Sequence, residues 1–499
     1  MTRSASHRLR ADELIARLVE PGSFALWDDE VVSDDPLGFH DTMSYRERLR
    51  LGRERSGATE AVLTGSARIG GVDVVVVAGV FGFLAGTLGV ATAERVVRAF
   101  ERATERRLPV IALPVSGGTR MQEGTPAFLQ MAACAAAVRR HRDAGLLYIA
   151  YLRHPTTGGV LGSWASLAHL TWAEPGALIG LTGPKVMAQL AGMDFPPDAQ
   201  RAEHLCRHGV VDEVVAHEDL PARLTAVLDL VARPTQAWQP RAVADAGDDQ
   251  PLAAWDAVEH SRRPDRPGVR ELLAACDARL VEVRGDGAGE DDPGCRVGLS
   301  RICGITAVVV AQHRPPGRRG ASVGAAGYRK ARRGMRLAGE LGLPLVTMVD
   351  TAGAAMTPHD EEGGLAASVA GCLAELSAVP VPTLAVLLGE GAGGGAIALL
   401  PADRVVAAQH AWLSPIVPEG AAVILHRSTE RAAEVAAAQW ITASDLRRLG
   451  IVDVVVNDTA ADAPHRLAGV VHAELAALLD RSPEERLQAR RRRYRSVAR

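Results

Sequence analysis

Short apolar runs rich in β-branched residues alternate along the chain with longer segments in which apolar residues recur every three to four positions. The first pattern predicts buried strands, and the second predicts amphipathic helices. Strands of this kind separated by helices are typical of parallel sheets that are covered on both faces. The expected strands are Val72–Val80, Leu108–Val115, Leu146–Leu152, Ile305–Gln312, Leu343–Asp350 and Thr383–Glu390, and the expected helices are Ala93–Arg106, Pro126–His141, Tyr328–Leu341 and Leu365–Ala378.

The alternating pattern occurs twice. ARIGGVDVVVVA in the first half resembles SRICGITAVVVA in the second, and LPVIALPVSGGTRM resembles LPLVTMVDTAGAAM. The residue numbers of matched positions differ by 233 in the first pair and by 241 in the last. Four matched positions in the same order, with an offset that changes so little along the chain, predict a tandem duplication. The matched positions are Gly71 with Gly304, Leu108 with Leu343, Gly159 with Gly395, and Gly209 with Gly450.

A chain of 499 residues is long for one hydrophobic core, so two or more domains are expected. Between the two copies, the stretch from Ala232 to about Gly268 is rich in proline and mixed charge, as linkers and packed connectors are. We therefore expect a first domain over residues 1–233, a connector over 234–268 and a second domain over 269–499.

Two glycine-rich stretches follow predicted strands at corresponding places in the copies. They are TTGGVLGSW, Thr156–Trp164, and GEGAGGGAIAL, Gly389–Leu399. Each reads as a strand end that turns into a helix start, where backbone N–H groups are free and a negative charge is favoured. Glycine lets a substrate oxygen approach those N–H groups closely. We expect two oxyanion sites, although glycines that merely let a helix pack on a sheet remain the alternative.

The composition narrows the classes of function. The formal net charge is -3, which indicates neither a nucleic-acid partner nor an anionic membrane surface. The six cysteines form no CxxC pair, which fits a reducing compartment and argues against a disulfide framework and against zinc. No signal peptide or long apolar segment is apparent, so a cytoplasmic protein is expected.

Longer motifs carry a resemblance to a family. SGGTRMQEGTPAFLQMA and PTTGGVLGSWASLAHLTWAEPGALIGLTGPKV resemble the β subunit of bacterial acetyl-CoA carboxylase carboxyltransferase. GYRKARRGMRLAGELGLPLVTMVDTAGA and GEGAGGGAIALLPADRVVAAQHAWLSPIVPEGAAVIL resemble its α subunit. The resemblance implies an α/β protein of two tandem crotonase-like (ClpP/crotonase) domains with ββα spiral cores, in which a β-like half is fused to an α-like half.

The same resemblance implies a reaction and its site. Carboxybiotin on a carrier protein gives up its carboxyl group to acetyl-CoA or a related short acyl-CoA, which yields malonyl-CoA for fatty acid biosynthesis. The N–H groups of Gly158 and Gly159 are expected to hold the thioester enolate, and those of Gly394 and Gly395 the ureido oxygen of biotin. No side-chain base is assigned. Further residues are expected to line the substrate sites: Gly117, Gly118, Arg120, Gly353 and Ala396.

Several departures from the family pattern leave alternatives open. The zinc ribbon of the β subunit is missing, so no zinc is expected, and no biotin-carrier or biotin carboxylase sequence is present. Biotin therefore has to arrive on another polypeptide. Where the family has DTPGAYPG, this chain has DTAGAAMT, which also allows a biotin-independent malonyl-thioester decarboxylase on the same scaffold. Family members join the first domain of one protomer to the second domain of another, which implies a homodimer or higher oligomer.

Individual polar residues have competing interpretations. Arg120 is a candidate for a phosphate contact, and an ion pair with Glu123 is equally compatible with the sequence. Asp350 and Glu390 end predicted strands, where helix capping is favoured over acid catalysis. The GxGxxA pattern at Gly391–Ala396 lacks the acid that a dinucleotide site requires about twenty residues later.

Overall fold

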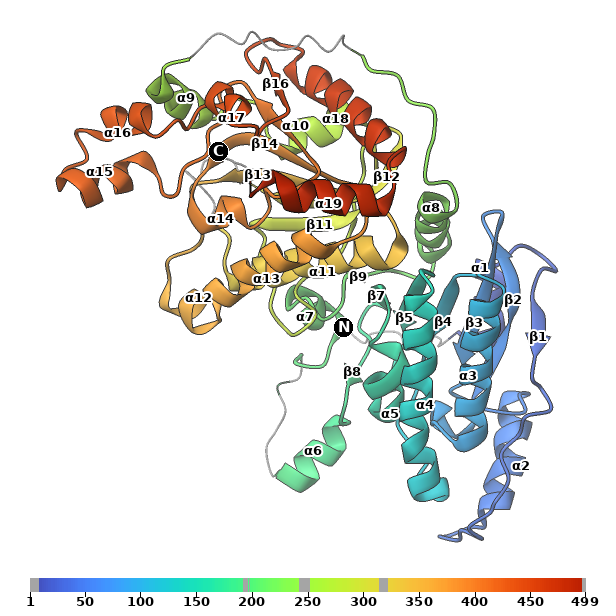
Figure 1. Ribbon diagram of the computed structural model, residues 1–499. Coiled ribbons are helices and arrows are strands. Elements are labelled where there is room, and N and C mark those ends of the chain that lie inside the picture. The colour runs from blue at the N-terminus through green and yellow to red at the C-terminus, as the bar shows by residue number, and fades with distance from the viewer. Residues whose placement is uncertain (1–8, 192–195, 197, 242–251, 314–321, 496–499) are drawn as a thin grey trace, which may run out of the picture. The chain divides into compact units, whose positions relative to one another are not determined.

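The computed structural model describes residues 9–191, 196, 198–241, 252–313 and 322–495. The chain folds into two compact units, Met1–Ala232 and Arg233–Arg499 (Figure 1). The second unit includes the segment 234–268, for which the sequence suggested a connector. Within that segment, helix α9 (Ala254–Ser261) packs in a small core with Trp412 and Ile441.

The first unit is built on a seven-stranded sheet with the order β1-β2-β3-β4-β5-β7-β9. β1, β2 and β3 pair antiparallel, and the strands from β3 onward pair parallel. A separate two-stranded sheet joins β6 to β8. The strands are β1 (Ala25–Trp27), β2 (Val62–Ile69), β3 (Val72–Gly79), β4 (Val110–Leu113), β5 (Tyr148–Leu152), β6 (Thr156–Thr157), β7 (Leu170–Ala173), β8 (Ile179–Gly180) and β9 (Glu213–Val214).

Two long helices, α3 and α4, lie side by side over one face of this sheet (Figure 1). Their apolar stripes, with Phe100 and Val138 among them, pack on Val75 and Tyr148 in one continuous core. The helices of the unit are α1 (Ala11–Leu18), α2 (Tyr45–Ser56), α3 (Val90–Glu105), α4 (Gly124–Asp143), α5 (Gly158–Val160), α6 (Pro184–Ala191), α7 (Ala202–Arg207) and α8 (Leu220–Ala232), with a π-helical turn at Leu161–Ala165 directly after α5.

The second unit repeats this design. Its seven strands have the order β10-β11-β12-β13-β14-β15-β16, with the same sequence of antiparallel and parallel pairs. The strands are β10 (Val281–Glu282), β11 (Cys295–Ile302), β12 (Ile305–Gln312), β13 (Leu345–Thr351), β14 (Thr383–Gly391), β15 (Arg404–Ala408) and β16 (Val454–Val456).

Helices α10 and α18 form one core with the second sheet, through Leu272 and Leu467. Helix α11 packs on helix α13 and on strands β11 and β12. The remaining helices are α10 (Val269–Ala275), α11 (Ala325–Leu341), α12 (Pro358–Glu362), α13 (Leu365–Ala378), α14 (Gly393–Ile397), α15 (Pro418–His426), α16 (Ala432–Ala438), α17 (Ala443–Arg448), α18 (Ala463–Leu479) and α19 (Pro483–Arg493).

The duplication and the α/β class are confirmed, and the predicted strands and helices lie within three residues of those observed. One expectation was wrong, because each sheet is mixed and not purely parallel. In both units the repeated motif at the start is a hairpin, with two left-handed residues at its tip: Gly70 and Gly71 in the first unit, Cys303 and Gly304 in the second. A two-residue turn of this kind joins antiparallel strands.

A disulfide joins Cys276, at the end of α10, to Cys303, at the tip of the β11–β12 hairpin. The sequence argued against disulfides because the cysteines form no recognisable pair. The two residues are 27 positions apart, and only the packing of α10 beside the hairpin brings their sulfur atoms together. Spacing along the chain therefore could not reveal the bond.

Candidate active site

The first glycine stretch forms a turn between β6 and α5. Thr157 is extended, Gly158 has a φ of +60°, and the chain then continues as a helix. A Cβ on Gly158 would stand 2.6 Å from the Cα of Gly118. Since that neighbour is backbone and a left-handed φ disfavours side chains, only glycine fits at position 158.

The N–H groups of this turn are not equally available. Gly158 donates its N–H to the carbonyl of Leu181 at 3.0 Å, so it is already engaged. For the N–H groups of Gly159 and Val160, no acceptor exists in the described part of the chain. The expectation for Gly158 therefore needs correction. Its role is to shape the turn, whereas Gly159 and Val160 present the free donors.

A second loop contributes another free N–H beside this turn. The Ser116 Oγ accepts from the N–H of Gly118 at 3.0 Å and donates to the carbonyl of Gly118 at 3.1 Å. This closed turn leaves the next N–H, that of Thr119, without an acceptor among the described residues. The Thr119 nitrogen would lie 3.5 Å from a Cβ on Gly158, so the two loops meet at this point.

The second glycine stretch has the same geometry. Gly393 has a φ of +61° and donates its N–H to the carbonyl of Ser414 at 2.8 Å. Within the described residues, the N–H groups of Gly394 and Gly395 have no acceptor, so both expected donors are free. Gly393 therefore corresponds to Gly158 and Gly394 to Gly159, which shifts the alignment by one residue from the pairing of Gly159 with Gly395.

The neighbouring loop is also repeated. Thr351 Oγ1 accepts from the N–H of Gly353 at 3.1 Å and donates to its carbonyl at 2.7 Å, as Ser116 does with Gly118. The N–H of Ala354 is again left without an acceptor among the described residues. A Cβ on Gly395 would stand 2.8 Å from the Ala354 nitrogen. Both units thus bring free N–H groups from two loops to one place, a geometry suited to stabilising an oxyanion.

A tyrosine hydroxyl adds to the second turn. Tyr328, in α11, is fully buried, and its hydroxyl lies near the Gln312 side chain but makes no hydrogen bond of ordinary geometry among the described residues. A Cβ on Gly395 would lie 2.9 Å from that oxygen, so the hydroxyl points at the turn. Nearby, the Gln312 Nε2 donates to the carbonyl of Gly395 at 2.7 Å and fixes the helix start. Sequence reasoning missed Tyr328, Thr119 and Ala354, although each stands in a motif that it used.

Arg120 does not have the expected role in substrate binding. Its side chain is fully buried, and its guanidinium donates to Glu60 at 2.6 Å and to Glu123 at 3.1 Å. Burial raises the pKa of Glu60, but the Arg120 guanidinium together with hydrogen bonds from Ser33 and Ala61 outweighs this effect, and the pKa lies below its ordinary value. All three guanidinium nitrogens of this buried side chain already donate to protein acceptors, so the ion-pair interpretation replaces the phosphate contact.

The other residues that were expected to line the substrate sites differ in their exposure to solvent. Gly117 is exposed, and Gly353 is partly exposed with a φ of +134°. Gly118 is buried, and its N–H is occupied by Ser116. Ala396 is fully buried inside α14, so its side chain cannot line a substrate site, which corrects that expectation.

Two arginines from the segment after α9 hold the acids at the ends of the second unit's strands. Arg266 pairs with Asp350 at 2.6 Å, and Arg262 pairs with Glu390 at 3.0 Å. Arg262 also hydrogen-bonds to Glu419, which lowers the pKa of that carboxyl group. Asp350 accepts from the N–H of Glu390 and caps no helix. The capping expectation for these acids was wrong, because the arginines occupy them.

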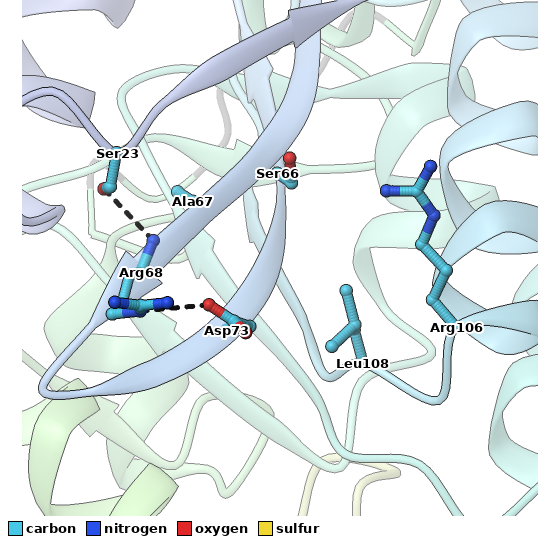
Figure 2. A pocket seen from close by; sticks show the side chains of 7 residues that line it. All are labelled: Ser23, Ser66, Ala67, Arg68, Asp73, Arg106 and Leu108. Atoms are coloured by element: carbon cyan, nitrogen blue, oxygen red, sulfur yellow. Dashed lines mark hydrogen bonds and ion pairs between the residues drawn. The ribbon is translucent and has the colours of Figure 1, made fainter.

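An open pocket of about 570 Å³ lies elsewhere on the first unit (Figure 2). It is found where β3 begins, whereas the glycine turn follows the carboxyl end of β5, at the opposite edge of the parallel strands. Arg68 and Asp73 form an ion pair of 3.1 Å on its wall. The pocket is therefore separate from the turn. Its lining residues are Ser23, Ser66, Ala67, Arg68, Asp73, Arg106 and Leu108.

None of the helices in the described ranges has the combination of length and apolar composition that crossing a bilayer requires.

Solved structures share this fold. The 12S transcarboxylase with methylmalonyl-coenzyme A bound matches with a TM-score of 0.77 and 21% identity, over 95% of this chain and 90% of that one. A single-chain, multi-domain long-chain acyl-CoA carboxylase matches with a TM-score of 0.70 and 20% identity, over 93% of this chain and 47% of that one. The two units of this chain thus share the fold of these proteins.

Sequence comparison establishes the family. The family model of acetyl co-enzyme A carboxylase carboxyltransferase-like proteins matches residues 247–498. A probable biotin-dependent acyl-coenzyme A carboxylase beta3 subunit of Mycobacterium tuberculosis is 48% identical, over 98% of this chain and 99% of that protein. The acetyl-coenzyme A carboxylase carboxyl transferase subunits beta/alpha of Salinispora arenicola are 39% identical, over 98% and 91%. The chain belongs to the acetyl-CoA carboxylase carboxyltransferase family.

Proposed function

We propose that this chain is the carboxyltransferase component of a biotin-dependent acyl-CoA carboxylase, with a β-subunit-like half fused to an α-subunit-like half. It transfers a carboxyl group, carried by biotin on a separate protein, to acetyl-CoA or a related short acyl-CoA, giving malonyl-CoA or its homologue. The observation that carries the proposal is the pair of equivalent turns, each with free N–H groups from two loops. The names of the relatives support the reaction class.

The first unit would bind the acyl-CoA. The thioester oxygen would accept from the N–H groups of Gly159 and Thr119, which have no other acceptor in the described chain. As the thioester loses a proton from C2, the oxygen gains negative charge, and preorganised donors stabilise it more than water does. Gly117 and Gly118, in the loop before Thr119, would border the acyl-CoA groove.

The second unit would receive biotin, and its residues fit that group. The oxygen of a cyclic urea accepts hydrogen bonds and carries no full charge, so it suits the N–H groups of Gly394, Gly395 and Ala354. The unpartnered Tyr328 hydroxyl is a fourth donor at the same place. When bound, biotin supplies the activated carboxyl group and the nitrogen that carries it. Gly353 would border this site.

The side chains of this chain would orient and stabilise the reactants and would not remove the proton. The strand-end acids Asp350 and Glu390, the nearest candidates for a base, are held in ion pairs by Arg266 and Arg262. In the transfer, the bond between the biotin nitrogen and the carboxyl carbon would break, C2 of the acyl group would give its proton to that nitrogen, and C2 would form its new bond to the carboxyl carbon.

Assembly completes the proposed site. Biotin carboxylase and the biotin carrier would be separate chains, and two copies of this chain would face the first turn of one to the second turn of the other. Exposed apolar side chains on the elements beside each turn support such a docking face, because water disfavours large exposed apolar groups. They are Met121, Phe128, Leu129 and Leu181 in the first unit and Met356, Ile397 and Ile416 in the second. Sedimentation that shows a fully active monomer would refute this arrangement.

An exchange assay tests the function. The purified chain is incubated with malonyl-CoA, with and without a biotinylated carrier or free biotin. We expect carboxyl transfer to biotin and formation of acetyl-CoA only when biotin is present. Carbon dioxide release without biotin would replace the proposal by a malonyl-thioester decarboxylase. No turnover under either condition would contradict both enzymatic functions.

The variant Gly394→Ala tests the second turn directly. A Cβ at this position would have its nearest neighbour, Val369 Cγ1, at 3.8 Å, so the fold tolerates the methyl group. The methyl group would stand beside the free N–H groups and keep a substrate oxygen away. We expect biotin-dependent exchange to fall by about 10²–10³, the loss typical of an oxyanion donor. Gly268→Ala, in the same unit and with its nearest neighbour at 3.5 Å, is the control.

A further inference from the structure

Two histidines and an aspartate meet in the second unit, outside the glycine turn. His260 is near the end of α9, His410 follows β15, and Asp458 follows β16. The Nδ1 of His410 lies 2.6 Å from Oδ1 of Asp458, and the Nε2 of His260 lies 3.9 Å from Oδ2. One ligand atom from each residue lies within 4.8 Å of the others. Three segments far apart in sequence thus place three potential metal ligands together.

The arrangement is compact and largely shielded from water. The two imidazole rings stack with their centroids 3.8 Å apart and an angle of 22° between them. The side chains are 17% exposed for His260, 12% for His410 and 4% for Asp458. The hydrogen bond between His410 and Asp458 explains one contact. Among the described residues, the imidazole of His260 has no polar partner within ordinary hydrogen-bond length.

We propose that His260, His410 and Asp458 bind a divalent transition-metal ion, with zinc the best match. Imidazole nitrogen and carboxylate oxygen bind zinc at about 2.0–2.2 Å in tetrahedral geometry. The observed separations of 2.6 Å and 3.9 Å lie on either side of the spacing between two tetrahedral ligands, and the stacked rings have to turn for their nitrogen lone pairs to converge on one ion. The residual exposure of both histidines leaves room for water as the fourth ligand. His260, His410 and Asp458 lie far apart along the chain, so no spacing of ligands in the sequence indicates this site.

A metal here would fasten the segment after α9 to the carboxyl edge of the second sheet. His260 is two residues before Arg262 and six before Arg266, the arginines that hold Glu390 and Asp350. Ser261, the next residue, accepts a hydrogen bond from the Trp412 indole at 2.9 Å. The metal would therefore have a structural role, in which it holds the segment after α9 near the second turn. This role does not depend on whether biotin is the substrate.

The test uses the untagged full-length chain, stripped of metal with a chelator and titrated with Co²⁺ and Zn²⁺. We expect one metal ion per chain by elemental analysis, a visible absorption band of tetrahedral Co²⁺, and a higher Tm with either metal. Asp458→Asn and His410→Ala should each abolish the band and the rise in Tm. His260→Ala, at the more exposed ligand, keeps the test valid if the buried variants fail to fold.

The control is His359→Ala, which removes an exposed histidine that lies 3.7 Å from Glu290 and belongs to no cluster of three possible metal ligands among the described residues. This variant should bind metal as the unmodified chain does. The proposal is overturned if the chain binds no cobalt, if the ligand variants bind it as well as the control does, or if a thiolate-to-cobalt band assigns the metal to a cysteine. These outcomes are separate from the carboxyl-exchange assay, which requires no metal at this cluster.

Discussion

The Tyr328 hydroxyl points at Gly395, so closely that a Cβ on the glycine would lie 2.9 Å from the phenolic oxygen. That hydroxyl is buried and has no partner in the described part of the chain. Burial raises its pKa, so it stays protonated and can donate. An unpaired buried hydroxyl costs stability unless a ligand completes it.

Tyr328→Phe separates a structural from a functional role of this hydroxyl. Removing an unsatisfied polar atom should leave Tm unchanged or raise it slightly. If the hydroxyl donates to the bound substrate, the rate of biotin-dependent exchange should fall about tenfold or more, while KM for malonyl-CoA stays the same. Melting curves and steady-state kinetics measure both. A drop in Tm with unchanged kinetics would assign Tyr328 to packing alone.

Gly158→Ala should damage the fold of the first turn, in contrast to Gly394→Ala. The added methyl group would meet the Cα of Gly118 at 2.6 Å, and the φ of +60° already disfavours a side chain. Together these effects should cost about 1–3 kcal/mol. Thermal melting and limited proteolysis near residue 158 report the change. A Gly158→Ala chain as stable as the parent would contradict the described turn.

Arg266→Met should destabilise the second unit more than Arg262→Met. Arg266 and Asp350 are 4% and 3% exposed, so removing the arginine leaves a buried carboxylate without its cation. This should lower the free energy of unfolding by about 3–5 kcal/mol. Arg262 is 28% exposed, and solvent can replace part of its contacts. Urea unfolding of both variants tests the order. Replacing Asp350 by leucine in the Arg266→Met chain should recover much of the loss, and no recovery would mean that the pair is not the cause.

His141 should make the first unit less stable in mild acid. The imidazole is fully buried, and burial lowers its pKa from 6.5 to about 4. Between those values the unfolded chain takes up a proton that the folded chain does not, so stability is full above pH 6.5 and is lost as the pH falls toward 4. The loss should reach about 3 kcal/mol.

The pH dependence of Tm tests the role of His141. His141→Gln should lower Tm at neutral pH, because a packed ring is lost, yet flatten the slope of Tm between pH 4.5 and 6.5. Substitution of the partly exposed His217, whose imidazole pairs with Glu174 at 3.0 Å, serves as the comparison. Identical slopes for His141→Gln and the parent chain would show that another group titrates.

Much of this protein follows from its sequence. The alternation of apolar strands and amphipathic helices, and its repetition, define two α/β units of one topology, because burial of continuous apolar runs requires covered sheets. The glycine stretches mark the turns, because positions such as Gly158 and Gly393 need a left-handed φ that side chains disfavour. These properties depend on residues that are close together along the chain, so the sequence alone predicts them.

Other properties depend on which segments meet. Whether an N–H is free depends on a distant carbonyl, as Leu181 shows for Gly158 and Ser414 for Gly393. The burial of Arg120 with Glu60, the disulfide of Cys276 with Cys303 and the cluster of His260, His410 and Asp458 all join residues far apart along the chain. Only tertiary packing decides these contacts, because hydrogen bonds and ion pairs act over a few ångströms in space regardless of separation in sequence.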